Sequence, residues 1–158
     1  MTEEKPDQKQ ILIQKIYMKD ASFESPNTPQ VYSEEWRPEI NLNLQAKNNV
    51  VGEDLREVVL SVTAEAKLGE KTAFIVEVHQ AGIFMMKGFT EDENRQLVGA
   101  YCPNLLFAFA REAVTDLVGK GGFPGFMLQP VNFDALYMKQ LEEMAKAKAE
   151  STTATDKH

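Results

Sequence analysis

Histidine and cysteine are the side chains that could act as a base or a nucleophile near neutral pH, and this chain has few of either. Its 158 residues include two histidines, His79 and His158, and one cysteine, Cys102. Because His158 ends a polar tail, a nucleophile, base and orienting acid would depend on His79 as the base. We therefore expect no such catalytic constellation and interpret His79 as a surface or interface residue.

Cys102 has two interpretations. It precedes Pro103 at an expected helix start, where the helix dipole could lower the pKa of the thiol. An unpaired cysteine is more often a small buried hydrophobic residue, and the sequence favours that interpretation. One cysteine and one histidine outside the tail cannot supply the ligands of a tetrahedral zinc site. A thiol-dependent enzyme or small-ligand-binding domain that uses Cys102 or His79 is the alternative to the binding functions considered below. We expect neither a metal nor another cofactor.

The charge of the chain disfavours nucleic acid as a partner. The sequence has 17 basic and 24 acidic residues, and the resulting net charge of -7 repels a phosphate backbone. Many acidic residues fall in polar turns or at a helix start, where solvation and capping explain them. Nothing in their spacing indicates that two carboxylates converge for acid–base chemistry.

Three further features favour a soluble cytoplasmic protein. Residues 1–9 are charged or polar and lack the apolar segment of a secretory signal. No stretch approaches the roughly 18 apolar residues that span a bilayer. A single cysteine excludes an intrachain disulfide and fits a reducing compartment.

Four strands are predicted from apolar residues that recur with a period of two. The third and fourth are separated by a short turn at Gly69, so we expect them to form an antiparallel hairpin. The first strand is apolar on both parities, which predicts that both of its faces are covered. A proline-rich loop that carries Trp36 separates the first two strands. The predicted strands are residues 10–24, 39–47, 58–68 and 73–84.

Helical spacing replaces strand spacing after these segments. Thr90 and Glu93 fit a capping box, which predicts a short helix that ends where Pro103 interrupts the pattern. A main helix begins beside Pro103 and ends at Gly119, and a last helix capped by Asn132 fades near Ala149. Strands followed by helices predict an α+β fold with a four-stranded antiparallel sheet. We divide the chain into a flexible tail (1–9), one domain (10–149) and a second flexible tail (150–158).

The sheet has more apolar surface than two amphipathic helices can cover in one copy. Association of copies could cover part of it, and a groove between the long loop and the last helix could accept extended polypeptide. For Trp36 and Tyr137, a place in such a groove and a place in the core are equally open. A structural adaptor for one folded partner is a third hypothesis.

Six short motifs, in the same order, resemble the SecB protein-export chaperone family, and the similarity runs from about residue 11 to residue 141. They are SFExPNxP at 22–29, WxPE at 36–39, GIF at 82–84, GAYCPN at 99–104, ARE at 110–112 and PVNFDAL at 130–136.

The resemblance implies a non-enzymatic homotetramer, a dimer of dimers, that needs no ATP. Such a protein holds precursor proteins unfolded and delivers them to SecA for export across the inner membrane. The C-terminal tail also contacts SecA in that family, but residues 151–158 are less acidic than this contact suggests. The positions implied for SecA binding are Asp20, Glu24, Ile75 and Glu77, and those for client binding are Trp36, Ile40, Leu42, Leu44, Tyr137 and Leu141.

Overall fold

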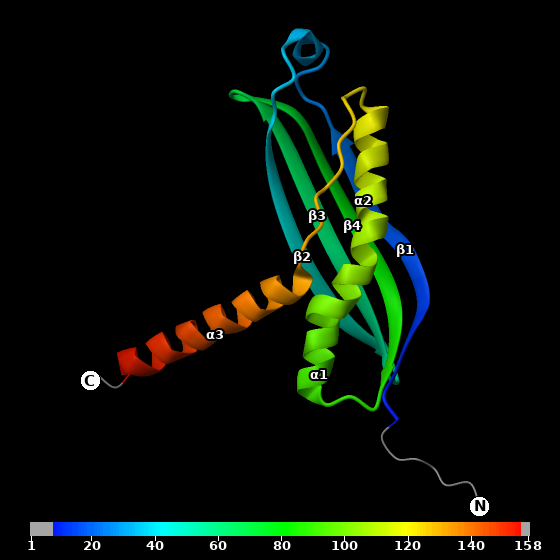
Figure 1. Cartoon of the computed structure of the whole chain (residues 1–158), viewed down its shortest axis with the longest axis vertical. Helices are drawn as coiled ribbons and strands as arrows, with labels where there is room; N and C mark the ends of the chain where they lie inside the picture. The colour runs from blue at the N-terminus through cyan, green and yellow to red at the C-terminus, as the bar shows by residue number, and fades with distance from the viewer. Residues whose placement is uncertain (1–7, 156–158) are drawn as a thin grey trace, which may run out of the picture.

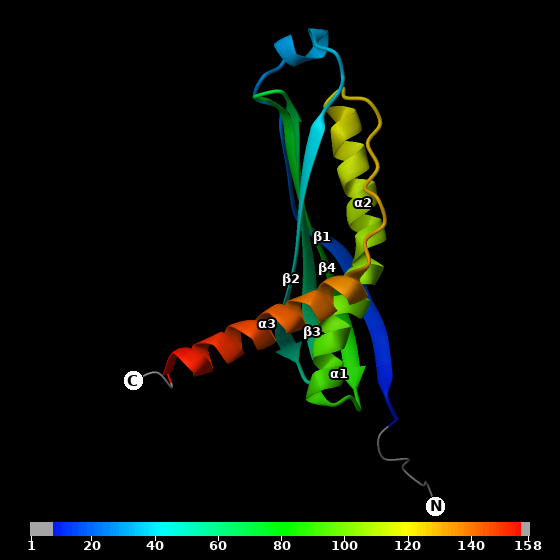
Figure 2. The same ribbon diagram turned by 60° about the vertical axis from the view of Figure 1, so that its left-hand side comes forward.

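A four-stranded antiparallel sheet with helices against one face makes up the computed structural model (Figures 1 and 2), which describes the backbone of residues 8–155 and the side chains of residues 8–151. The spatial order of the strands is β1-β4-β3-β2, so β1 and β2 are the edges. The predicted α+β class is confirmed. The elements are β1 (Gln10–Glu24), β2 (Glu39–Gly52), β3 (Leu55–Leu68), β4 (Lys71–Lys87), α1 (Glu91–Gln96), α2 (Cys102–Lys120) and α3 (Phe133–Thr155), with a 3-10 turn η1 (Gln30–Ser33) and a π-helical turn η2 (Leu97–Tyr101).

Strands β2, β3 and β4 are longer than the sequence predicts. Residues 48–52, which lie between the second and third predicted strands, pair with β3 instead, with Asn48 opposite Val58 and Val50 opposite Arg56. An edge strand that faces solvent tolerates polar side chains, so hydrophobic alternation underestimates its length. The connection narrows to a tight turn in which Asp54 has φ 56°. The predicted β3–β4 hairpin is confirmed, and Gly69 takes φ 64° in its turn.

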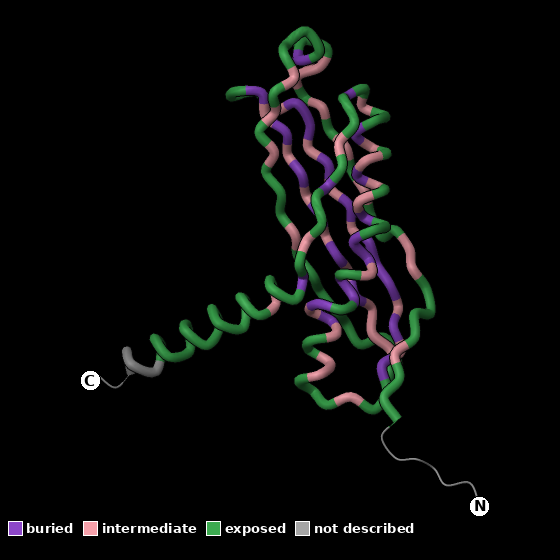
Figure 3. Tube along the Cα trace, viewed as in Figure 1, coloured by how far each residue is buried: buried purple, intermediate pink, exposed green. Residues whose placement is uncertain are grey.

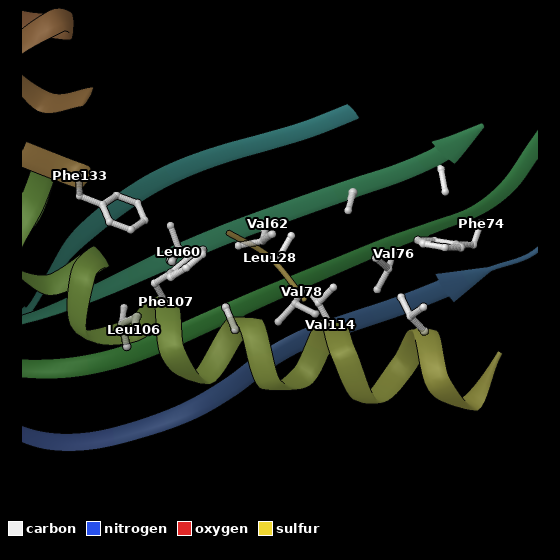
Figure 4. Close-up of a cluster of buried hydrophobic side chains, with 14 of the residues drawn as sticks. Leu60, Val62, Phe74, Val76, Val78, Leu106, Phe107, Val114, Leu128 and Phe133 are labelled. Carbon is white, nitrogen blue, oxygen red and sulfur yellow. The ribbon is translucent and has the colours of Figure 1, made fainter. Parts of the chain in front are cut away.

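The core lies between α2 and the sheet (Figure 3). Leu106, Ala110, Val114 and Val118 recur every four residues on α2 and are fully buried. Each of the fully buried leucine and valine side chains contributes on the order of 1.5 to 3 kcal/mol, so this stripe holds the helix on the sheet. Figure 4 shows the strand side chains that meet the helix, among them Leu60, Val62, Val76 and Val78.

Strand β1 was predicted to be covered on both faces, and in a single chain this is wrong. Leu12 and Met18 are each 50% exposed, and Ile13 is also exposed. The strand lies at the sheet edge, while the helix layer covers mainly β3 and β4. Register irregularities at Ile13/Lys15 and Met18/Asp20 also change which side chains face the helices.

Pro103 was expected to interrupt the helical pattern, but the chain stays helical from Glu91 to Lys120. The turn η2 takes a π form, in which the amide of Cys102 donates to the carbonyl of Leu97. Proline has no amide hydrogen and its ring clashes with the carbonyl four residues earlier, so a wider turn accommodates it without ending the helix. The predicted capping box is confirmed, because Glu93 N donates to Thr90 Oγ1 and Thr90 N donates to Glu93 Oε1.

The last helix does not end near Ala149, as predicted, but continues to Thr155. Alanine, lysine and glutamate favour helix, and the Ser151 hydroxyl donates back to the Lys148 carbonyl at 2.9 Å. Residues 150–155 therefore belong to α3 rather than to a tail without structure. The outer parts of both predicted tails, residues 1–7 and 156–158, lie outside the described residues.

Candidate functional site

The face of the sheet that carries no helix gathers the four residues assigned to SecA binding. The β1–β4 register places Asp20 opposite His79 and Glu24 opposite Ile75, and Glu77 lies between these two pairs. Side chains two apart along a strand share a face, and Val76 and Val78 point into the core, so Ile75 and Glu77 point away from the helices. We call this helix-free side the polar sheet face.

Hydrogen-bonded side chains cover much of the polar sheet face. Lys19 donates to Glu57 at 2.8 Å, and the Tyr17 hydroxyl also donates to Glu57. These two donors hold the pKa of the Glu57 carboxyl below its usual range. Burial, together with the hydrogen bond and the charge of Glu57, raises the pKa of Tyr17 to about 12. Tyr17 therefore remains a neutral donor, and Glu57 remains charged, across the neutral range.

Sequence reasoning missed that Ser61, His79 and Glu77 form a row on this face. Ser61 Oγ lies 2.6 Å from His79 Nδ1, and His79 Nε2 lies 2.7 Å from Glu77 Oε1. Counting back from the turn at Gly69 misses this pair by one residue, because the register shifts between Ala66 and Lys67 before it brings Ser61 opposite His79.

The row has the residue types of a hydrolytic triad, but its surroundings do not complete one. Acyl transfer needs donors aimed at a developing oxyanion, and the neighbouring strand amides are engaged in the sheet ladder. His79 is only partly exposed beside Glu77, which fits the predicted surface role. Cys102 is fully buried, and this burial raises the pKa of its thiol to about 12, so a reactive thiolate is not supported.

A groove on the helix side of the sheet brings together three of the residues assigned to client binding. Leu44 of β2 and Tyr137 and Leu141 of α3 line it with residues of η2. We call it the α3 groove. Its apolar lining also includes Ala46, Leu60, Val98, Phe133 and Leu136.

Helix α3 supplies an open apolar wall to this groove. Its first turn is anchored, because Phe133 is buried and packs edge-on against Phe107 with ring centroids 5.6 Å apart. Asn132 caps the helix as predicted, since its side chain accepts from the amide of Ala135 at 3.0 Å. Further along, Met138, Leu141 and Met144 are exposed, Met144 by 68%. The helix then runs away from the sheet (Figures 1 and 2).

Trp36 lies elsewhere, in an aromatic cluster at the end of the sheet where β2 begins. Its ring lies 6.3 Å from that of Phe74 and 5.4 Å from that of Phe123. Phe23 and Tyr32 contact the same Phe123 ring. Trp36 is therefore packed on the core while remaining partly exposed, which combines the two interpretations left open for it.

The six client positions thus form a discontinuous track that runs from Trp36 along β2 to the first turns of α3. Ile40 is partly buried and Leu42 is exposed on the face that β2 turns toward the helices. They lie between Trp36 at one end and Leu44 with the α3 groove at the other. At roughly 3.3 Å per residue, the eight steps along the chain from Trp36 to Leu44 span up to about 26 Å.

Metal clusters and membrane-spanning helices are both absent from the part of the chain that the structure describes. No group of three or more His, Cys, Asp or Glu side chains there could hold a metal ion. No helix within residues 8–155 is long and apolar enough to cross a membrane.

Known proteins provide an independent comparison. A family model described as "Preprotein translocase subunit SecB" matches residues 4–144. The chain is 57% identical to the protein-export protein SecB of Nitrosococcus oceani over 94% of this chain and 92% of that one. It is 53% identical to the protein of the same name from Methylococcus capsulatus, over 96% of this chain and 97% of that one.

A solved structure supports the fold. The Mycobacterium tuberculosis Rv1957 SecB-like chaperone, in complex with a ChAD peptide from the Rv1956 HigA1 antitoxin, superposes with a TM-score of 0.63 at 16% identity. The match covers 77% of this chain and 87% of that one. With the family match over most of its length and relatives more than half identical to it, the chain belongs to the SecB family.

Proposed function

We propose that this protein is an ATP-independent holding chaperone that binds unfolded precursor proteins in the cytoplasm and delivers them to SecA for export across the inner membrane. The observation that carries the proposal is an open groove on one side of the sheet and a charged face on the other. The groove combines apolar side chains with Gln45, Asn48, Arg95 and Gln140. The family membership and the names of the relatives support the same function.

Client binding rests on the apolar track along β2 and on α3. An unfolded chain exposes the hydrophobic side chains that a native protein hides, so shallow apolar sites select the unfolded form. Each client side chain that becomes fully buried contributes on the order of 1.5 to 3 kcal/mol, partly offset by the ordering of the client. Several such contacts retain a slow-folding precursor without requiring one sequence, and no chemical step is needed.

Delivery to SecA uses the polar sheet face. Glu24 lies opposite Ile75, Glu77 lies two residues from Ile75 on the same strand, and Asp20 lies further along β1, opposite His79. A partner surface with basic residues around an apolar contact would complement this arrangement. Because the client track lies on the opposite side of the sheet, the chaperone can hold a client and contact SecA at the same time.

Assembly into a homotetramer, a dimer of dimers, covers apolar surface that one copy leaves open. Met18 of β1, Phe109 of α2 and Met127 are exposed around one hollow between the sheet edge and the helix. Leu12 and Ile13 lie further along the same edge strand. An exposed edge with apolar side chains is suited to contact with a second copy.

A refolding assay tests the function. Purified protein in excess should slow the refolding of a denatured secretory precursor without added nucleotide. A Leu44→Asp, Leu141→Asp double variant serves as the groove control and should slow refolding less, since it places charges where clients would bury apolar groups. An unchanged refolding rate with the wild-type protein would count against the proposal.

A further inference from the structure

The ring of Tyr137 lies against Gly99 so closely that no side chain fits between them. A Cβ atom placed on Gly99 would lie 2.5 Å from Tyr137 Cδ2 and 2.8 Å from Cε2. Real Cβ contacts are not this short, so any other residue at position 99 has to displace the ring. We propose that Gly99 is a positioning residue for client binding. Because it has no side chain, the ring of Tyr137 packs directly against the backbone of η2, and this contact sets the angle at which α3 forms the wall of the α3 groove.

The backbone that contacts the Tyr137 ring belongs to the π-helical turn η2. Gly99 is the middle residue of η2, and Pro103 lies four residues after it, where an ordinary helix would need an amide hydrogen bonded to the Gly99 carbonyl. The turn is wider for this reason, and π turns of this kind are frequent at functional sites. Gly99 and Val98 of this turn both line the α3 groove, so the widened backbone is part of the groove surface.

Two contacts near the start of α3 fix its direction. Phe133 is buried against Phe107, and Tyr137, one turn later, is partly buried on η2. A methyl group on Gly99 requires the ring to move by about 1 Å to reach ordinary van der Waals distance. Tyr137 lies about 6 Å along the helix from Phe133, so this movement tilts α3 by about 10°.

The tilt has its effect at the groove rather than at the core. Leu141 lies about 12 Å from Phe133 along the helix and so moves by about 2 Å, which is enough to lose close contact with a client side chain bridging to Leu44. Leu106 and Val114 of the core do not contribute to the α3 groove. Alanine also favours helix more than glycine does, so we expect the fold to tolerate the change.

The inference rests on the proposed function and is tested with a permanently unfolded, fluorescently labelled precursor. Gly99→Ala should weaken its affinity about fivefold to tenfold. The matched control is Gly119→Ala, at a helical glycine where an added methyl group would meet no heavy atom within 4 Å apart from its chain neighbours and the backbone of its own helix, and this variant should leave affinity unchanged. Circular dichroism and light scattering check that both variants fold and assemble as the wild type does.

A double-mutant cycle separates positioning from a general structural effect. Tyr137→Ala removes the ring that the new methyl group would strike, so Gly99→Ala should cause no further loss in that background. If Gly99→Ala changes nothing, or weakens binding equally with and without the ring, the inference is wrong. If Gly99→Ala alone does not fold, the Gly99→Ala, Tyr137→Ala variant decides, because it should bind like Tyr137→Ala. Failure of the wild-type protein to bind the precursor would instead overturn the proposed function itself, and the inference with it.

Discussion

Reversing two charges on the polar sheet face should separate SecA binding from client binding. The change is Asp20→Lys with Glu77→Lys, on neighbouring strands of the helix-free side. An exposed ion pair contributes about 0.2 to 1 kcal/mol, and reversal replaces attraction with repulsion of similar size. Two reversals therefore cost about 1 to 4 kcal/mol, which is about a fivefold to several-hundredfold loss of affinity.

The assay is titration of SecA binding and of unfolded-precursor binding with the same protein samples. A matched control is Glu53→Lys with Glu70→Lys, which makes the same change in net charge at exposed residues in or beside hairpin turns. The double variant of the polar sheet face should lose SecA affinity and keep client affinity, and the control should keep both. The difference from wild type should shrink in high salt, because exposed charges are screened.

Two results would refute this reasoning. Equal loss of SecA and client binding would show that the two sides of the sheet are not independent surfaces. Equal loss of SecA binding in the hairpin-turn control would show that net charge, rather than the position of Asp20 and Glu77, governs the interaction.

Three other predictions concern stability and reactivity. Leu106→Ala, at a fully buried position, should lower the free energy of unfolding in urea by about 2 to 5 kcal/mol, and a loss near zero would contradict the described core. Cys102 should react with a thiol reagent at about pH 8 only after unfolding, since its thiol is buried and its pKa is about 12; rapid labelling of the native protein would oppose this. Glu57 has a lowered pKa because Lys19 and Tyr17 donate to it, so its contribution to stability is full above about pH 4.3, the unfolded value, and is lost as pH falls through the folded pKa. The stability difference between wild type and Glu57→Gln should therefore shrink on acidification, and a difference that grows would contradict this.

Much of the sheet could be predicted because hydrophobic alternation and turn residues lie close together in the sequence. Alternation identified the buried parity of β3 and β4, and the turn at Gly69 predicted that they form a hairpin, although not the register shift between Ala66 and Lys67. The position of β1 at an edge could not be predicted, because strand order depends on pairing between distant segments. The exposure of Met18 follows from that order rather than from its own sequence.

One predicted helix boundary, at Pro103, was wrong, because proline can either end a helix or be accommodated within one. Pro103 was interpreted as a break, but a π turn accommodates it within a continuous helix. That turn leaves no pattern in side-chain spacing, so Gly99 was recognised only as part of a motif. The contact of Gly99 with Tyr137 joins residues far apart in the sequence, which periodicity does not detect.

The candidate surfaces were predictable in part. Side chains an even number of residues apart on one strand share a face, so the sequence alone groups Asp20 with Glu24 and Ile75 with Glu77, and the register adds that the two pairs share one face. The roles of these residues in SecA binding, and of the client positions, stay predictions. Trp36 and Tyr137 were assigned together by resemblance, while the structure places them in separate clusters.

Strand β4 serves both sides of the molecule with alternate residues. Val76 and Val78 enter the core, while Ile75 and Glu77 belong to the polar sheet face. Inserting one residue into the middle of this strand would exchange the two sets beyond the insertion, burying a carboxylate and exposing valines. Evolution can therefore change the two surfaces separately by substitution, but a change in the length of β4 alters both at once.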